Sequence, residues 1–119
     1  MKWEQIIGQQ SIKNLLQDSI KDSRVGHAQL FVGEEGFGVL PLALAMAQEI
    51  FEKENPASVH KVENLNHLDL HFSFPVFTEN KNSLSTRLFD QWREFILENP
   101  YSSFDDWTSF LESENKIGR

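Results

Sequence analysis

One stretch of the sequence decides the predicted fold: AQLFV at residues 28–32, GEEGFG at 33–38 and VLPLALAMAQEIFEKE at 39–54. The first part is short, apolar and followed by glycine, which favours a buried strand of a parallel sheet. The last part is apolar nearly all round as far as Met46, and Pro41 stands in its first turn, where a missing N–H costs little. We therefore predict a strand, a glycine-rich turn and a helix covered on most sides, in that order.

The glycine-rich turn has the shape of a phosphate-binding loop. Backbone N–H groups and the positive end of the helix dipole converge on an anion after such a turn. Gly33 and Gly38 have the spacing of the pattern GxxxxGK[ST]. Val39 and Leu40, however, stand where its lysine and its hydroxyl residue belong, and the acidic pair Glu34–Glu35 adds negative charge where a triphosphate needs positive charge. The pattern indicates a degenerate phosphate loop, with the shape but without the chemistry.

Three interpretations of this loop remain open. The glycines, Gly36 included, can simply allow a tight strand-to-helix turn, and the pattern favours this interpretation. The second is a weak or vestigial nucleotide site. The third is a dinucleotide-type turn, although the spacing is GxxGxG and not GxGxxG, and no ribose-binding acid is evident.

The remainder of the chain alternates between helical and strand patterns. Apolar side chains at helical spacing predict a helix around residues 12–20 and further helices over 85–98 and 103–114. Ser103-x-x-Asp106 resembles a capping arrangement at the start of the last helix. Residues 68–75 alternate between apolar and polar side chains, which predicts a half-buried strand.

The composition excludes several classes of protein. The chain has 119 residues, no cysteine, and 11 basic against 18 acidic side chains, a net charge of −7. Without cysteine there is no disulfide scaffold, thiolate metal site or cysteine nucleophile. No apolar run approaches the roughly 18 residues of a membrane span, and no signal peptide is visible. We therefore expect a cytoplasmic protein without membrane contact, which binds other proteins more readily than DNA.

Other candidate sites have weaker support. His67 and His71 are four residues apart, as zinc ligands on a helix can be, but the alternation over 68–75 does not hold them on a helical face. Trp92 and Trp107 lie on apolar stripes and are predicted to be core residues or anchors for a partner. No catalytic residue and no metal site is predicted.

Four motifs give the sequence a family resemblance. They are IIGQ at residues 6–9, RVGHAQLFVG at 24–33, the loop itself at 33–38, and HLDLH at 67–71. In this order and spacing they resemble the N-terminal part of the delta-prime subunits of DNA polymerase III, which belong to the bacterial clamp loader and the AAA+ family. The resemblance is greatest to the version found in Bacteroidetes-type bacteria.

The resemblance implies an α/β fold: a truncated P-loop NTPase or AAA+ parallel sheet flanked by helices, with residues 1–119 as the N-terminal part of an ATPase-like domain. It implies a non-hydrolysing stator subunit that supports sliding-clamp loading in DNA replication, within a complex that has DNA polymerase activity. The implied partners are other clamp-loader subunits, and primed DNA is reached only through the complex. Neither ATP nor zinc is expected as a cofactor.

A vestigial nucleotide site follows from the resemblance and from the loop. Ile7 and Gly8 stand where catalytic relatives approach adenine, so the resemblance implies a remnant of that pocket. The loop and the start of the following helix supply the remaining members: Gly33, Gly36, Gly38, Val39 and Leu40.

Two departures from the family pattern shape further expectations. Residues 52–66, where many clamp-loader subunits have a four-cysteine zinc module, contain no cysteine. The later Walker B motif, arginine-finger motif, lid and collar have no counterpart, so we expect an N-terminal fragment that self-associates through unpaired apolar surface. Two other functions stay open: a divergent P-loop enzyme that binds a nucleotide, and a small stand-alone α/β adaptor domain.

Overall fold

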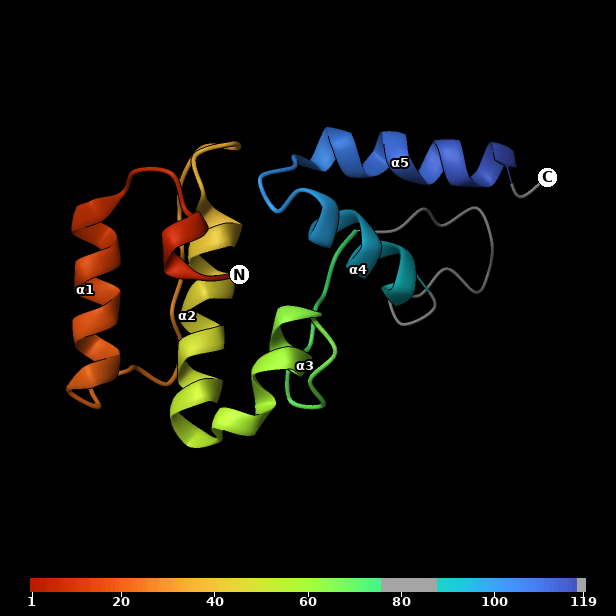
Figure 1. The fold of residues 1–119 in the computed structure, drawn as a ribbon. Helices are drawn as coiled ribbons and strands as arrows, with labels where there is room; N and C mark the ends of the chain where they lie inside the picture. Colours follow the sequence, from red (N-terminus) through yellow and green to blue (C-terminus); the bar gives the residue numbers. More distant parts are fainter. Residues whose placement is uncertain (76–87, 118–119) are drawn as a thin grey trace.

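The computed structural model describes residues 1–75 and 88–117, and Figure 1 shows how the helices are arranged. In chain order they are η1 (Trp3–Gln5), α1 (Gln10–Lys21), α2 (Val39–Glu54), η2 (Pro56–Ser58), α3 (Val59–Glu63), α4 (Phe89–Glu98) and α5 (Phe104–Ile117). Helices α1 and α2 lie side by side, and α4 and α5 lie on the other side of α2 from α1. None of the helices in the described ranges has the length and apolar content of a membrane span.

The predicted parallel sheet does not form among the described residues, so the α/β fold class is wrong. No residue of 1–75 or 88–117 belongs to a strand. The two segments predicted as strands contact different clusters: Phe31 packs on the cluster of Leu42, and Phe74 belongs to the cluster of Leu44. Residues two apart in a helix point to opposite sides. The segments therefore lie on different faces of α2, where neither can supply the backbone partner that the other needs.

The segment 28–32 is neither a strand nor buried, so the predicted buried strand is wrong. Phe31 packs inward, whereas Leu30 and Val32 are 87% and 84% exposed. No backbone hydrogen bond to another described residue involves this segment. Its polar backbone and two apolar side chains are therefore open to contact.

The segment 68–75 departs from a strand at its start. The backbone N–H groups of Asp69 and Leu70 donate to Nδ1 and to the carbonyl of His67, at 3.0 and 3.1 Å. This turn leaves Leu68 85% exposed. The later apolar side chains still pack against one cluster, as the alternation predicts: Leu70, Phe72 and Phe74.

Helix α2 is the centre of the molecule. Leu42 and Ala45 meet Ile6 in a small apolar cluster that Leu16 of α1 also contacts. Leu44 points the other way, into a larger cluster built mostly from the C-terminal half. The prediction that this apolar helix is covered on most sides is confirmed, because its two faces meet different parts of the chain.

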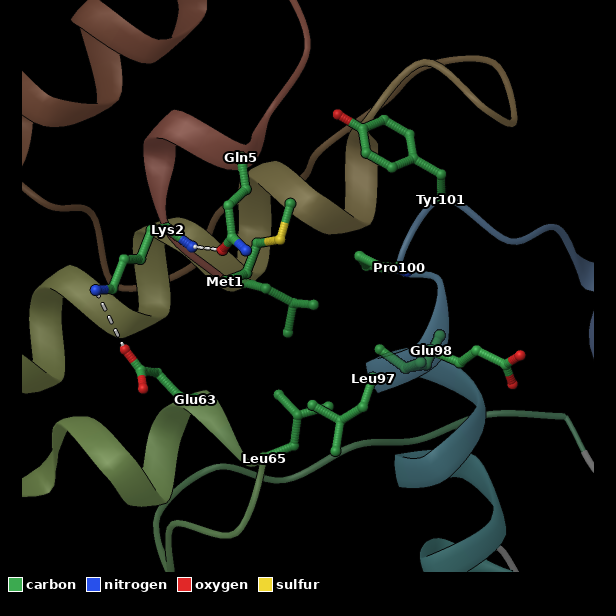
Figure 2. Close-up of a pocket in the computed structure, with 11 residues that line it drawn as sticks. Met1, Lys2, Gln5, Glu63, Leu65, Leu97, Glu98, Pro100 and Tyr101 are labelled. Carbon is green, nitrogen blue, oxygen red and sulfur yellow. Dashed lines mark hydrogen bonds and ion pairs between the residues drawn. The ribbon is translucent and has the colours of Figure 1, made fainter.

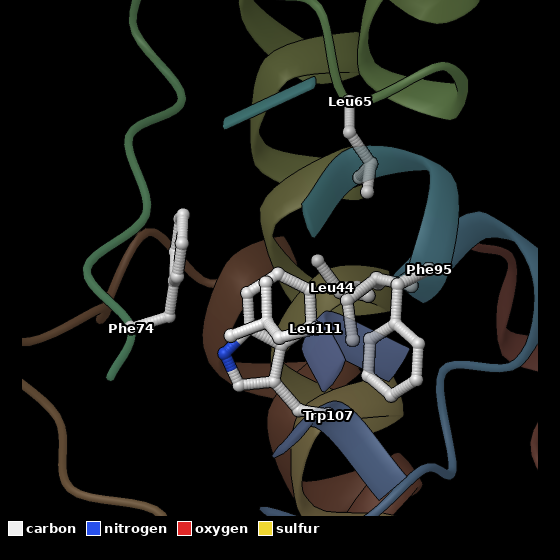
Figure 3. Packing of buried hydrophobic residues seen from close by; sticks show 7 residues of the cluster. Leu44, Leu65, Phe74, Phe95, Trp107 and Leu111 are labelled. Atoms are coloured by element: carbon white, nitrogen blue, oxygen red, sulfur yellow. The ribbon is translucent and has the colours of Figure 1, made fainter. Parts of the chain in front are cut away.

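The larger cluster is an aromatic core that joins α4 and α5 to α2. Its buried members, shown in Figure 3, are Leu44, Leu65, Phe74, Phe95, Ile96, Trp107 and Leu111. Trp107 is 2% exposed, and its indole N–H donates to the carbonyl of Pro75 at 2.7 Å. Phe74 meets Trp107 edge-on, with ring centroids 5.4 Å apart, and stacks on Trp92 at 4.6 Å. Trp107 is therefore a core residue, and it fixes the segment that ends at Pro75 against α5.

Helices α2 and α4 end in the same way, with the sequences ENPAS at residues 54–58 and ENPYS at 98–102. In both turns the asparagine side chain accepts a hydrogen bond from the N–H two residues on, Ala57 and Tyr101, at 3.1 and 3.0 Å. The serine hydroxyl donates to the asparagine carbonyl at 2.7 Å in both. Because proline also stops the helix, the second turn holds Tyr101 in a defined position.

Helix α5 begins with the predicted capping arrangement. The N–H of Asp106 donates to Oγ of Ser103 at 3.1 Å, and the N–H of Ser103 donates to Oδ2 of Asp106 at 2.9 Å. The helix predicted over 103–114 corresponds to α5. The helix predicted over 85–98 corresponds to α4 over Phe89–Glu98, with Leu88 as its N-cap, and residues 85–87 lie outside the described residues.

Candidate functional site

The glycine loop, residues 33–38, joins the irregular segment before it to α2. Gly36 and Gly38 have φ angles of 85° and 96°, a backbone region that favours glycine. The N–H of Phe37 donates to the carbonyl of Glu34 at 3.3 Å, and Gly38 is the N-cap of α2. The loop is therefore a tight turn placed directly at the start of a helix, as the glycine spacing predicts.

The side chains at the lysine and hydroxyl positions of the pattern take part in packing. The side chain of Val39 lies over the start of the loop: a Cβ added to Gly33 would be only 2.7 Å from Cγ2 of Val39. Leu40 is half-buried and packs against the larger cluster. Neither position offers a cation to a phosphate or a hydroxyl to magnesium.

A small cavity of about 240 Å³ lies between the loop and the turn that follows α4. Its charged lining is Glu34 and Glu35, and no lysine or arginine of the described residues lines it. Pockets that hold small ligands are typically about 300–1,000 Å³. The cavity is therefore small for a nucleotide, and its carboxylates would repel a polyphosphate.

Ile7 and Gly8 lie next to this loop. Gly8 and Gln9 both have positive φ angles, 68° and 58°, so the chain turns sharply before α1. The side chain of Gln9 donates to the carbonyl of Phe37 at 3.2 Å. The N–H of Ile7 donates to the hydroxyl of Tyr101 at 2.9 Å, while the Ile7 side chain is 81% exposed. The structure thus brings the predicted Ile7–Gly8 remnant to the loop that forms the rest of the predicted site.

Tyr101 is the residue of this site that the sequence did not indicate. It is the single tyrosine of the chain and comes from the turn between α4 and α5. Its Cε1 lies 3.4 Å from the position that a Cβ on Gly38 would take. The ring therefore rests on a residue without a side chain. The ENPYS motif predicts a stiff turn, but nothing in it places that turn on the glycine loop.

His67 makes local contacts, whereas His71 does not take part in them. The ring of His67 packs on Phe51 with centroids 4.3 Å apart, and its Nδ1 accepts from the N–H of Asp69. His71 is exposed. Across the part of the chain that the structure describes, no three potential metal ligands gather.

A larger cavity of about 610 Å³ lies beside η1, α3 and α4, and Figure 2 shows its lining. Leu65 and Leu97 point into it, and Lys2 pairs with Glu63 at its rim, 3.6 Å apart. Burial lowers the pKa of the Met1 α-amino group, an effect that the Glu63 carboxylate opposes. At this cavity the Glu63 carboxylate therefore lies near two cationic groups, the Lys2 ammonium and the Met1 α-amino group. At the loop cavity, by contrast, the charged side chains are all acidic.

Two comparisons with known proteins find similarity to subunits of DNA polymerase III. The family model for DNA polymerase III, delta subunit, matches residues 8–106, which is most of the chain. The DNA polymerase III subunit delta′ of Bacillus subtilis (strain 168) is 36% identical over 74 residues. That similarity covers 56% of this chain but spans only 22% of the relative's length. No solved structure matches the chain.

Proposed function

Because this chain belongs to the DNA polymerase III delta subunit family, we propose that it acts as a delta-prime-type subunit of the bacterial clamp loader. Its role is that of a stator, which holds its neighbours in place while the complex loads the sliding clamp onto primed DNA, and it does not hydrolyse ATP. Its partners are other clamp-loader subunits in the cytoplasm, and it reaches DNA through them.

The packing of Val39 and Leu40, which stand where an active phosphate loop has its lysine and hydroxyl, is the observation that supports this proposal. Val39 packs over Gly33, and Leu40 packs into the aromatic core. An ATPase of this type needs a lysine at the β- and γ-phosphates and a hydroxyl on magnesium. A loop that keeps its shape while these two side chains serve packing fits a subunit that remains fixed through the cycle of its partners.

The charge of the chain supports protein partners over direct DNA contact. The formal net charge is −7. Proteins that bind DNA directly neutralise phosphates with lysine and arginine, and their affinity depends on that contact. An acidic subunit therefore fits contact with protein neighbours that themselves hold the DNA.

Reconstitution tests this role. The protein is mixed with the remaining clamp-loader subunits of the same organism and separated by size-exclusion chromatography. We expect it to elute with them as one complex, and clamp loading onto primed DNA to require it. A loader that assembles and loads clamps equally well without this protein would contradict the proposal.

A nucleotide titration separates this role from that of a nucleotide-binding enzyme. A fluorescent ATP analogue with Mg²⁺ is added to the protein alone, and in parallel to a subunit of the same complex that has an intact lysine. We expect saturable binding only by the second subunit. The variant Glu34→Gln/Glu35→Gln should also fail to bind, because removing repulsion does not supply the lysine. Micromolar binding or turnover by the unmodified protein would rule out the stator role.

A further inference from the structure

Tyr101 connects parts of the molecule that are far apart in the sequence. Its hydroxyl accepts a hydrogen bond from the N–H of Ile7 at 2.9 Å, across 94 positions of the chain. Its ring lies against Gly38, with Cε1 3.4 Å from the position of an added Cβ. One side chain from the α4–α5 turn therefore touches both the turn before α1 and the N-cap residue of α2.

The turn that presents Tyr101 is held from within. The N–H of Tyr101 donates to the side-chain oxygen of Asn99 at 3.0 Å, and the Ser102 hydroxyl donates to the Asn99 carbonyl at 2.7 Å. Pro100 restricts the backbone between them. On the other side, Gly38 is buried, and its φ of 96° disfavours any residue with a side chain. Both surfaces are thus shaped for this contact.

We propose that Tyr101 is a built-in clasp of the degenerate loop, which ties the Ile7 turn to Gly38 and closes the loop to a nucleotide. The inference rests on the proposed function only in taking the loop as the remnant of a nucleotide site. A ligand that reached the loop would need the space that the Tyr101 turn borders, where a cavity of about 240 Å³ is left. The clasp holds the two segments together without any ligand, as a fixed subunit requires.

Hydrogen exchange at the Ile7 amide tests the clasp in the full protein. Tyr101→Phe removes only the hydroxyl, so the Ile7 amide should exchange roughly two- to tenfold faster. The loop amides should change little, because the ring still covers Gly38. Tyr101→Ala should speed exchange at both Ile7 and the loop. Unchanged exchange at Ile7 in both variants would overturn the clasp, and the conservative Phe variant keeps the test valid if the Ala variant unfolds.

The repeated helix ending supplies a matched control. Asn55→Ala and Asn99→Ala remove the same side-chain hydrogen bond from the same kind of turn, at 3.1 and 3.0 Å. Only the second turn carries Tyr101. We expect Asn99→Ala to speed exchange at Ile7 and Asn55→Ala to leave it unchanged. Equal effects of the two variants would mean general loosening and would overturn the inference.

Closure of the loop is tested by opening it in a repaired background. The variant Val39→Lys/Leu40→Thr restores the lysine and the hydroxyl, and a fluorescent ATP analogue with Mg²⁺ is the probe. Adding Tyr101→Ala should tighten binding by about tenfold or more, which corresponds to about 1.4 kcal/mol. Equal behaviour of the two proteins, whether both bind or neither does, would overturn the closure. Such a failure leaves clamp-loader assembly untouched, and a failed assembly would leave the exchange result at Ile7 standing.

Discussion

The side chain of Val39 covers Gly33 so closely that a Cβ at residue 33 would lie 2.7 Å from Cγ2 of Val39. Valine is branched at Cβ and has little rotamer freedom in a helix, so it cannot easily turn away. The glycine at residue 33 is therefore required by the valine, and not by a phosphate. In the phosphate-loop pattern, a glycine at this position leaves room for a ligand. Here Gly33 leaves room for the side chain of Val39.

Gly33→Ala should lower the free energy of unfolding by about 1–3 kcal/mol, because the added methyl group overlaps the Val39 side chain. Val39→Ala should relieve the overlap, so the double variant should lose less than the sum of the single losses. Urea denaturation measures all three. Gly26→Ala is the matched control, because its nearest neighbour is the Ala28 carbonyl oxygen at 3.6 Å. Equal losses at residues 26 and 33 would argue against the overlap.

Trp107→Phe should destabilise the protein by about 2–4 kcal/mol, through a cavity in the aromatic core and the loss of the hydrogen bond to Pro75. The indole is 2% exposed and donates to Pro75 at 2.7 Å. Thermal or urea unfolding gives the change. Phe104→Leu, in the same helix at a residue that is 52% exposed, should cost less than about 1 kcal/mol. Comparable losses in the two variants would place Trp107 outside the core.

Lys13→Met should cost about 1–2 kcal/mol, although the substituted residue keeps most of the apolar stem. Lys13 is 8% exposed, and its ammonium donates to the carbonyl of Ile6 at 2.6 Å, so the variant leaves that carbonyl without its donor. Lys13 forms no salt bridge within the described residues, and the loss should therefore be nearly the same at low and high salt. Lys21→Met, on the exposed end of the same helix, should stay within about 0.5 kcal/mol. A strong salt dependence would indicate a charged partner for Lys13.

The open segment 28–32 should drive self-association at high protein concentration. Leu30→Lys/Val32→Lys should shift the protein toward monomer in light scattering, because charge on an unpaired segment opposes pairing. Leu68→Lys is the matched control: Leu68 is 85% exposed, close to the 87% of Leu30, but stands in a tight turn. It should leave association unchanged. A monodisperse monomer of the unmodified protein at every concentration would contradict this prediction.

The loop chemistry and the helix ends could be read from residues that are close together in the chain. Hydrogen bonds over two to four positions form three of these features: the glycine turn before α2, the Ser103–Asp106 cap of α5, and the proline-containing ends of helices. The missing lysine at residue 39 is also a property of the sequence, because it depends only on which residue stands there. These features follow from local geometry and therefore do not depend on contacts with distant parts of the chain.

A sheet and the Tyr101 clasp both depend on residues that are far apart in the chain. Short-range patterns predict a sheet that does not form, and they give no indication of the clasp. The alternation over 68–75 indicates which side chains turn inward, whereas the apolar run over 28–32 indicates a buried strand that does not form. A strand also needs a neighbouring backbone, and α2 places these segments on different faces. Tyr101 and Ile7 are separated by 94 positions. Their meeting follows from how the aromatic core docks α4 and α5 on α2, because only long-range packing brings such positions together.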